Sequence, residues 1–137
     1  MVVSLVYVGL QVRQNTAAIQ TSTSQEVYQL NQEQGLLIME SADFAEIILR
    51  AELGQELSPV DSIRYAHYLN LVLNTHEAVY TNALQGTMEP ELAAAWLDGI
   101  AGLTCKPGME GYWAWGRSGY HGAFRAAMDS AFAATQC

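Results

Sequence analysis

The feature that most constrains this fold is a long run near the start of the chain that lacks both glycine and proline. Residues 10–34 contain neither, and the segment that leads into them, residues 1–12 (MVVSLVYVGLQV), is nearly all apolar. Such a run favours one continuous helix, which we expect from Val2 to Met39 or Glu40. At 1.5 Å per residue it would measure roughly 55 Å. A domain of 137 residues does not need so long a helix, so its first part should project or pair with another chain.

The apolar segment 1–12 predicts a contact surface. A membrane-spanning helix needs about 20 apolar residues, so this segment is too short to span a bilayer alone. It also lacks the basic region and the Ala-x-Ala cleavage site of a secretory signal. Two interpretations remain open, the remnant of a membrane anchor or a helix that packs on another copy of the chain. The residues predicted to make the self-association contact are Val3, Val6, Tyr7 and Leu10.

Charge and composition exclude several classes of partner. The formal net charge is −8, the only lysine is Lys106, and the five arginines are scattered along the chain. Nucleic-acid binding depends on clustered basic residues that displace phosphate counterions, so no nucleic-acid partner is predicted. The same acidity argues against a basic face for anionic lipid. Half of the residues are hydrophobic, and β-branched runs are scarce after residue 8, which favours helices.

Cap and turn residues divide the rest of the chain into helices. Ser58 followed by Pro59 has the pattern of an N-cap and a first helical residue, and Gly86 is a natural stop for the same helix. Asp43 and Glu46 have the spacing of a capping box. The helices expected after the first one cover residues 44–53, 59–85, about 87–103 and about 107–134.

These boundaries predict an all-α fold. We expect a single domain, residues 1–137, built as an antiparallel four-helix bundle with a long, projecting N-terminal helix and a short extra helix. The first helix should have a narrow buried edge formed by Ile19, Val27, Leu30 and Leu37. The last helix, with Pro107 as its first residue, should carry a core stripe of Trp113, Tyr120, Phe124, Met128 and Phe132.

The two cysteines, Cys105 and Cys137, do not have the spacing of a metal site. Zinc would need four ligands from a chain that has only three histidines. Two interpretations stay open for the pair: two unrelated thiols, or a disulfide, since each cysteine lies near the end of an expected helix.

The segment from Leu5 to Thr16, LVYVGLQVRQNT, resembles the start of a large group of uncharacterised bacterial proteins. In that group a membrane helix ends in a Tyr-Leu-Ala-x-Gln-x-Arg-Gln-Asn-Thr-like segment and a small helical domain follows. A glycine after the central helix corresponds to Gly86, and a Pro-Gly-x-x-x-x-Trp-like entry to the last helix corresponds to residues 107–113. The resemblance implies a bacterial protein, associated with the inner membrane or cytoplasmic, and it transfers no functional residue.

A polar stripe runs along the expected helix 59–85. Its members step by three or four residues and therefore share one helix face; they are His67, Asn70, Asn74, Glu77 and Thr81. One interpretation is a solvent-exposed or interface face. The other is a cleft that binds a small molecule, because the helix is apolar elsewhere and a polar stripe on a central helix needs partners. Trp96 and Trp113 would then line the cleft with His67, Asn70, Asn74 and Glu77.

No catalytic motif is evident. Ser118 and His121 have the spacing to touch on a helix, but no Gly-x-Ser-x-Gly turn surrounds Ser118. The Glu-x-x-His pairs of di-iron bundles are absent. We therefore expect neither an enzyme nor a metal or other cofactor. The leading hypothesis is a non-enzymatic interaction module that binds itself or a membrane protein through residues 1–12. The second hypothesis is a small-molecule-binding bundle.

Overall fold

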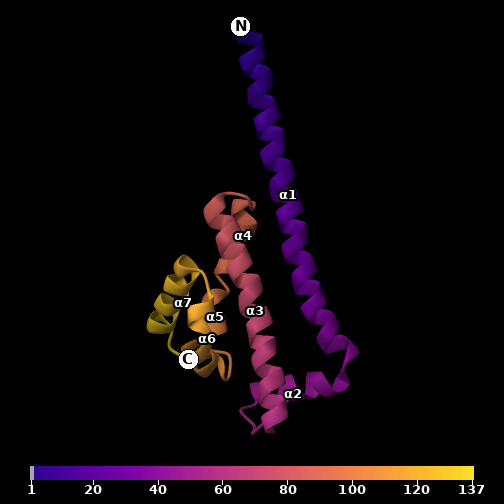
Figure 1. Ribbon diagram of the computed structural model, residues 1–137, viewed down its shortest axis with the longest axis vertical. Helices are drawn as coiled ribbons and strands as arrows, with labels where there is room; N and C mark the ends of the chain where they lie inside the picture. The colour runs from indigo at the N-terminus through magenta and orange to yellow at the C-terminus, as the bar shows by residue number, and fades with distance from the viewer. Residues whose placement is uncertain (1) are drawn as a thin grey trace.

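The computed structural model describes residues 2–137, with side chains from Ser4 onward, and every regular element in this part of the chain is a helix (Figure 1). The predicted all-α helical bundle is therefore confirmed. The elements are α1 (Val2–Glu40), α2 (Ala42–Glu52), α3 (Pro59–Gln85), α4 (Pro90–Leu97), α5 (Ile100–Thr104), α6 (Met109–Gly116), the 3-10 turn η1 (Arg117–Gly119) and α7 (Gly122–Ala134).

Helix α3 is the centre of the bundle, with α1 on one side, α5 to α7 on the other, and α4 at the end of α3, where it shares a cluster with α1 (Figure 1). α1 and α3 run antiparallel. The Gln34 amide donates to the Leu71 carbonyl over 2.9 Å and also to the Thr75 hydroxyl, and the Gln20 amide donates to the Gly86 carbonyl over 3.4 Å. Gln20 thus marks the level at which α3 ends, and the preceding part of α1 extends beyond the rest of the molecule, as predicted.

Local capping chemistry fixes the ends of α3 as expected. The Ser58 hydroxyl accepts a hydrogen bond from the Asp61 amide over 3.1 Å, and Pro59 follows as the first helical residue. Gly86 ends the helix with φ +68°, a conformation that only glycine adopts readily. The expected capping box of α2 is wrong. Ser41, not Asp43, caps that helix by accepting from the Phe44 amide.

Asp43 is used instead in an ion pair that joins two helices. Its carboxylate lies 2.5 Å from the Arg64 guanidinium on α3. The guanidinium also lies over the Phe44 ring, 5.5 Å from the ring centroid. A side chain that finds a charged partner on another helix is no longer available to cap its own, which explains why the cap moves to Ser41.

The two C-terminal helices predicted from the sequence are both interrupted. The helix expected over 87–103 stops at Leu97 and resumes at Ile100. The helix expected over 107–134 begins at Met109, because Gly108 has φ +73° and Pro107 lies in the turn. It breaks again at Tyr120, which is extended at φ −95° and ψ 154°. These breaks cost little free energy, because glycine has a low helix propensity and occupies positions 99, 116, 119 and 122.

The break at Tyr120 changes the path of the chain but not the core. Trp113, Tyr120, Phe124 and Met128 are buried as predicted, and Phe132 is partly buried against the same cluster. They pack on Leu69 and Leu73 of α3, together with Ile47 and Ala51 of α2. A smaller cluster joins α1 to the other end of α3 through Val27, Val79, Met88 and Ala93.

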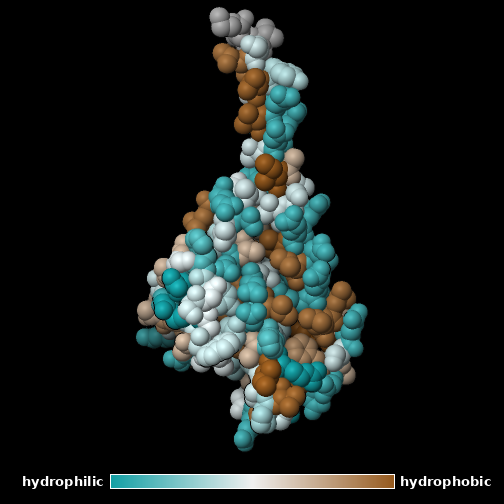
Figure 2. Space-filling view, viewed as in Figure 1, coloured by the Kyte–Doolittle hydropathy of each residue, from teal (hydrophilic) through white to brown (hydrophobic). Residues whose placement is uncertain are grey.

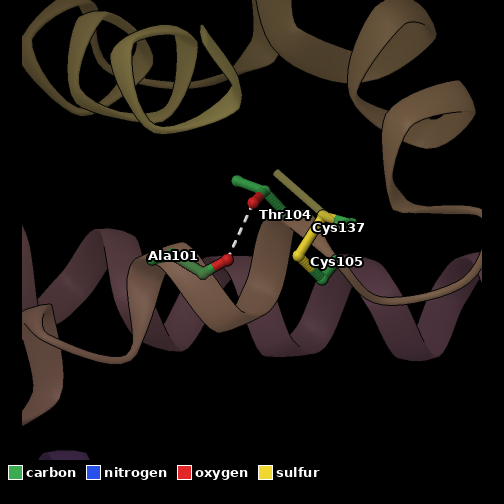
Figure 3. Close-up of a disulfide and its surroundings, with 4 residues drawn as sticks. All are labelled: Ala101, Thr104, Cys105 and Cys137. Atoms are coloured by element: carbon green, nitrogen blue, oxygen red, sulfur yellow. Dashed lines mark hydrogen bonds between the residues drawn. A yellow bond between two sulfur atoms is a disulfide. The ribbon is translucent and has the colours of Figure 1, made fainter. Parts of the chain in front are cut away.

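A disulfide joins Cys105 and Cys137, with a separation of 5.4 Å between their Cα atoms (Figure 3). Of the two interpretations left open by the sequence, the structure has the disulfide. Next to it, the Thr104 hydroxyl donates to the Ala101 carbonyl over 2.7 Å. The bond closes a loop over a sequence separation of 32 that contains α6, η1 and α7. It therefore fastens the end of the chain to the end of α5.

Candidate functional site

The projecting part of α1, which we call the tip and define as residues 4–19, has no buried or half-buried side chain. Val6, Tyr7 and Leu10 are exposed by 59%, 61% and 55%. Val3 lies outside the residues whose side chains are described. Figure 2 shows hydrophobic side chains on the tip where it projects beyond the rest of the molecule. The described residues therefore leave the predicted self-association surface uncovered, and its role stays a prediction.

Apolar side chains point in several directions from the tip between Leu5 and Val12. Leu5, Val6, Tyr7, Val8, Leu10 and Val12 are all more than half exposed. At about 100° per residue these positions are spread around much of the helix. Monomeric proteins rarely leave a continuous apolar patch of this kind in water. Within residues 2–137, no helix is both long and apolar enough to cross a membrane.

The expected buried edge of α1 is wrong in part. Val27 is buried, but Ile19, Leu30 and Leu37 remain between 42% and 50% exposed. α3 approaches along a neighbouring line instead, which buries Thr23 and binds Gln34 through its side-chain amide. Thr23, Val27 and Gln34 thus form the edge of this helix that faces α3, and the other apolar residues flank the contact.

Two members of the predicted polar stripe, Asn70 and Glu77, connect α3 to the C-terminal segment. The Asn70 amide donates to the Tyr112 hydroxyl over 2.6 Å and to the Tyr120 hydroxyl over 3.1 Å. Its carbonyl oxygen accepts from the Asn74 amide over 3.1 Å. One turn further along α3, Glu77 accepts from the His121 backbone amide over 2.5 Å. Asn70 and Glu77 are half-buried and Asn74 is exposed. The stripe is therefore a contact between helices that is exposed to solvent along one edge.

The other proposed cleft residues are not brought together. His67 is exposed at the mouth of a hollow beside Asn70. Trp113 is buried in the core, where its indole N–H donates to Asp129 over 2.8 Å. Trp96 belongs to the smaller cluster and contacts His76, with 5.5 Å between ring centroids. The six residues therefore do not line a common cleft.

A different cleft lies between the start of α3 and α6, and it was not predicted from the sequence. Two adjoining hollows of about 560 Å³ and about 440 Å³ share Ala66, Tyr112 and Trp115 in their walls. Trp115 is 81% exposed at this position. The sequence alone predicts that Trp115 lies on a helix, but it does not show which side of that helix is buried. The exposed indole could therefore be recognised as part of a cleft only once the fold was known.

Burial and charge shift several pKa values. Burial, followed by the Glu52 carboxylate and Tyr68, raises the pKa of Tyr65 to about 12. Burial and then the hydrogen bond with Tyr112 raise the pKa of Tyr120 above its ordinary value. Burial lowers the pKa of His76, against the opposing effect of its hydrogen bond to the Val72 carbonyl. The two phenols therefore stay protonated, as hydrogen-bonding groups rather than bases, at neutral pH.

Of the candidate catalytic pair, only His121 is seen in a structural role. Ser118 is exposed in η1, whereas His121 caps α7 by accepting the Ala123 amide at its Nδ1 over 3.3 Å. Among the described residues no group of three histidine, cysteine or carboxylate side chains is placed to hold a metal ion. In comparisons with known proteins, the chain matches no family model, no curated protein and no solved structure.

Proposed function

We propose that the chain is a non-enzymatic helical interaction module whose tip is covered, in the working state, by another copy of the same chain. The observation that carries this proposal is the exposure of Leu5, Val6, Tyr7, Val8, Leu10 and Val12 on a helix that continues without a break into a well-packed body. Burying apolar side chains contributes about 25 cal/mol per Å² of surface removed from water. That gain favours association of the tip.

The body supports an adaptor role rather than chemistry. Its half-buried polar groups Asn70 and Glu77 are used in contacts between helices. The Cys105–Cys137 disulfide favours an oxidising compartment, because such bonds persist there and are rare in the cytosol. We therefore assign the body to an oxidising compartment rather than to the cytoplasm.

The test is the mass of the full chain in plain buffer and in detergent, beside a variant that lacks residues 1–12. The proposal predicts a dimer or larger oligomer in plain buffer, and a soluble monomer with an unchanged helical spectrum for the shortened variant. A monodisperse monomer of the full chain in plain buffer would contradict self-association. A chain that is soluble only with detergent or lipid would assign the tip to a membrane and also contradict the proposal.

A second candidate function is supported by the cleft beside Trp115. Its walls are mainly apolar, and the exposed indole at its edge could stack on a flat, uncharged ligand. The test is titration with Nile red, a neutral fluorescent probe, for the natural chain and for Trp115→Ala. Leu49→Ala on α2 is the control, since Leu49 is an exposed apolar residue that does not line the cleft. Equal probe binding by all three proteins would remove this candidate.

A further inference from the structure

We infer that two copies of this chain pair through antiparallel α1 helices, so that the tip of each lies in the groove between α1 and α3 of the other. This inference rests on the proposed self-association and adds its geometry. It assigns the contact to one side of the tip, formed by Leu5, Val8 and Val12. Val6, Tyr7 and Leu10 lie on the opposite side and remain outside the contact.

The first observation is that one side of the tip continues along the body as a stripe of branched aliphatic side chains, whereas the side with Val6 and Leu10 continues only through Tyr28 and Met39. At about 100° per residue, the members of this α1 stripe fall within about 60° of the helix circumference. They are Leu5, Val8, Val12, Ile19, Leu30 and Leu37. Each is between 42% and 70% exposed. This includes Ile19, Leu30 and Leu37, which lie in or next to the half of α1 that packs beside α3. A stripe of this length fits a partner helix laid along α1.

The second observation is that four of the six members of the α1 stripe are related by symmetry about the level of Thr21. Leu5 and Leu37 lie 16 residues from it on either side, and Val12 and Leu30 lie 9 residues from it. A two-fold axis passing beside Thr21 therefore brings Leu5 of one copy to Leu37 of the other, and Val12 to Leu30. Such self-complementary pairing is what a symmetric dimer requires.

The lengths of the two halves of α1 agree with the same axis. The part that projects, residues 2–19, is about 27 Å long, and the part beside α3, residues 20–40, is about 32 Å long. Antiparallel pairing about Thr21 lays the tip of one copy beside the body half of the other. The two bodies then lie at opposite ends of the dimer and do not compete for the same space (Figure 1).

The third observation concerns the groove that would receive the tip. Leu30 and Leu37 border a hollow of about 210 Å³ whose far wall is Leu71 of α3. Leu71 is 37% exposed, so apolar side chains from both helices face this groove. The tip of a second copy would cover all three leucines, which the body of its own chain leaves open to water.

Two glutamates favour the antiparallel over the parallel arrangement. Glu26 and Glu33 are exposed and lie about 20–60° to one side of the α1 stripe. Parallel pairing would place each beside its own copy, and like charges in close contact are unfavourable. Antiparallel pairing about Thr21 places them instead near the level of Asn15 and Gln11 of the other copy, which are uncharged.

The first test compares substitutions on opposite sides of the tip. Leu5→Asp should weaken the dimer by roughly 100-fold or more, because each dimer buries Leu5 twice. Leu37→Asp, at the other end of the same contact, should have a similar effect and leave the helical spectrum unchanged. Leu10→Asp is the matched control, since Leu10 is equally part of the tip but lies outside the α1 stripe. The measurement is sedimentation equilibrium in plain buffer.

The second test measures distances between nitroxide labels attached at Gln25→Cys, Gln14→Cys or Gln11→Cys, one site per protein. The native cysteines form the disulfide and do not react. The axial separation between the two labels should rise from about 12 Å to about 21 Å and about 30 Å along this series, because each residue away from Thr21 adds about 3 Å. Pulsed electron paramagnetic resonance reads these separations.

The outcomes separate this inference from the proposed function. A dimer that loses affinity with Leu5→Asp but not Leu10→Asp, with separations that grow along the label series, supports it. A dimer whose separations are the same at all three sites is parallel and overturns the inference while self-association stands. Equal sensitivity to Leu5→Asp and Leu10→Asp means burial on all sides of the tip, by lipid or a larger bundle, and also overturns it. A monomer of the natural chain defeats both.

Discussion

In α1 the more apolar half is exposed and the more polar half is packed against the body. Residues 4–12 are almost entirely apolar and exposed, whereas the half beside α3 is rich in glutamine, serine and threonine and yet makes the packed contact. In that half Thr23 is buried and Gln34 binds α3 directly. The comparison teaches that hydrophobicity determines how much a segment gains from being covered. Whether its own chain covers it depends on where the neighbouring helix ends.

The largest expected contrast is between the core of the body and the tip. Phe124→Ala should lower the free energy of unfolding by about 3–5 kcal/mol, because it removes a fully buried ring. Leu5→Ala should leave the unfolding of the body within about 0.5 kcal/mol of the natural chain, because Leu5 is 70% exposed. Urea unfolding of both variants, each under conditions where it is monomeric, makes the comparison. A comparable loss in both would show that the tip packs on the body.

The disulfide tests whether the two regions are independent. Replacing Cys105 and Cys137 together by serine should cost about 4 kcal/mol, the loop-closure entropy of a bond with this sequence separation. Urea unfolding gives this value. Because the disulfide lies in the body, the dissociation constant of the dimer should not change as long as the variant is folded. A variant that folds normally but no longer dimerises would contradict the separation of tip and body.

Within the body, the polar stripe offers a finer contrast between neighbours on α3. Asn70→Leu should cost about 1–3 kcal/mol, because the hydroxyls of Tyr112 and Tyr120 lose their partner. Asn74→Leu should change the free energy of unfolding by less than about 0.5 kcal/mol, because Asn74 is exposed. Equal costs, measured by urea unfolding, would place Asn74 inside a closed interface.

The smallest effect expected is a pH dependence confined to the body. Burial lowers the pKa of His76, so its unfolded form binds a proton more readily than its folded form. Stability should therefore fall as the pH drops below about 6.5, the ordinary histidine pKa, and level off once His76 is protonated in the folded state too. His76→Gln should remove this part of the dependence between pH 7.5 and pH 5. Dimerisation should not follow it, because the proposed contact between α1 helices contains no histidine.

The sequence by itself determined the elements whose signals are local. The absence of glycine and proline from residues 10–34 was enough to predict α1, and Ser58, Pro59 and Gly86 were enough to bound α3. Capping bonds and backbone preferences act over a few residues, so they are present in the sequence before any tertiary contact forms. The same holds for the aromatic residues of the C-terminal core, which were predicted correctly although their helix is broken.

Only the tertiary structure decided the contacts between helices. The polar stripe of α3 became an interhelix network because the extended backbone at Tyr120 brings phenols and a backbone amide beside Asn70 and Glu77. The edge of α1 that faces α3 contains Thr23, Val27 and the Gln34–Thr75 hydrogen bond, whereas Ile19, Leu30 and Leu37 stay exposed. Such choices depend on groups far apart in the sequence, and each involves competing contacts of similar free energy. Periodicity within one helix cannot rank those contacts, so the cleft at Trp115 and the groove beside Leu71 emerged only from the fold.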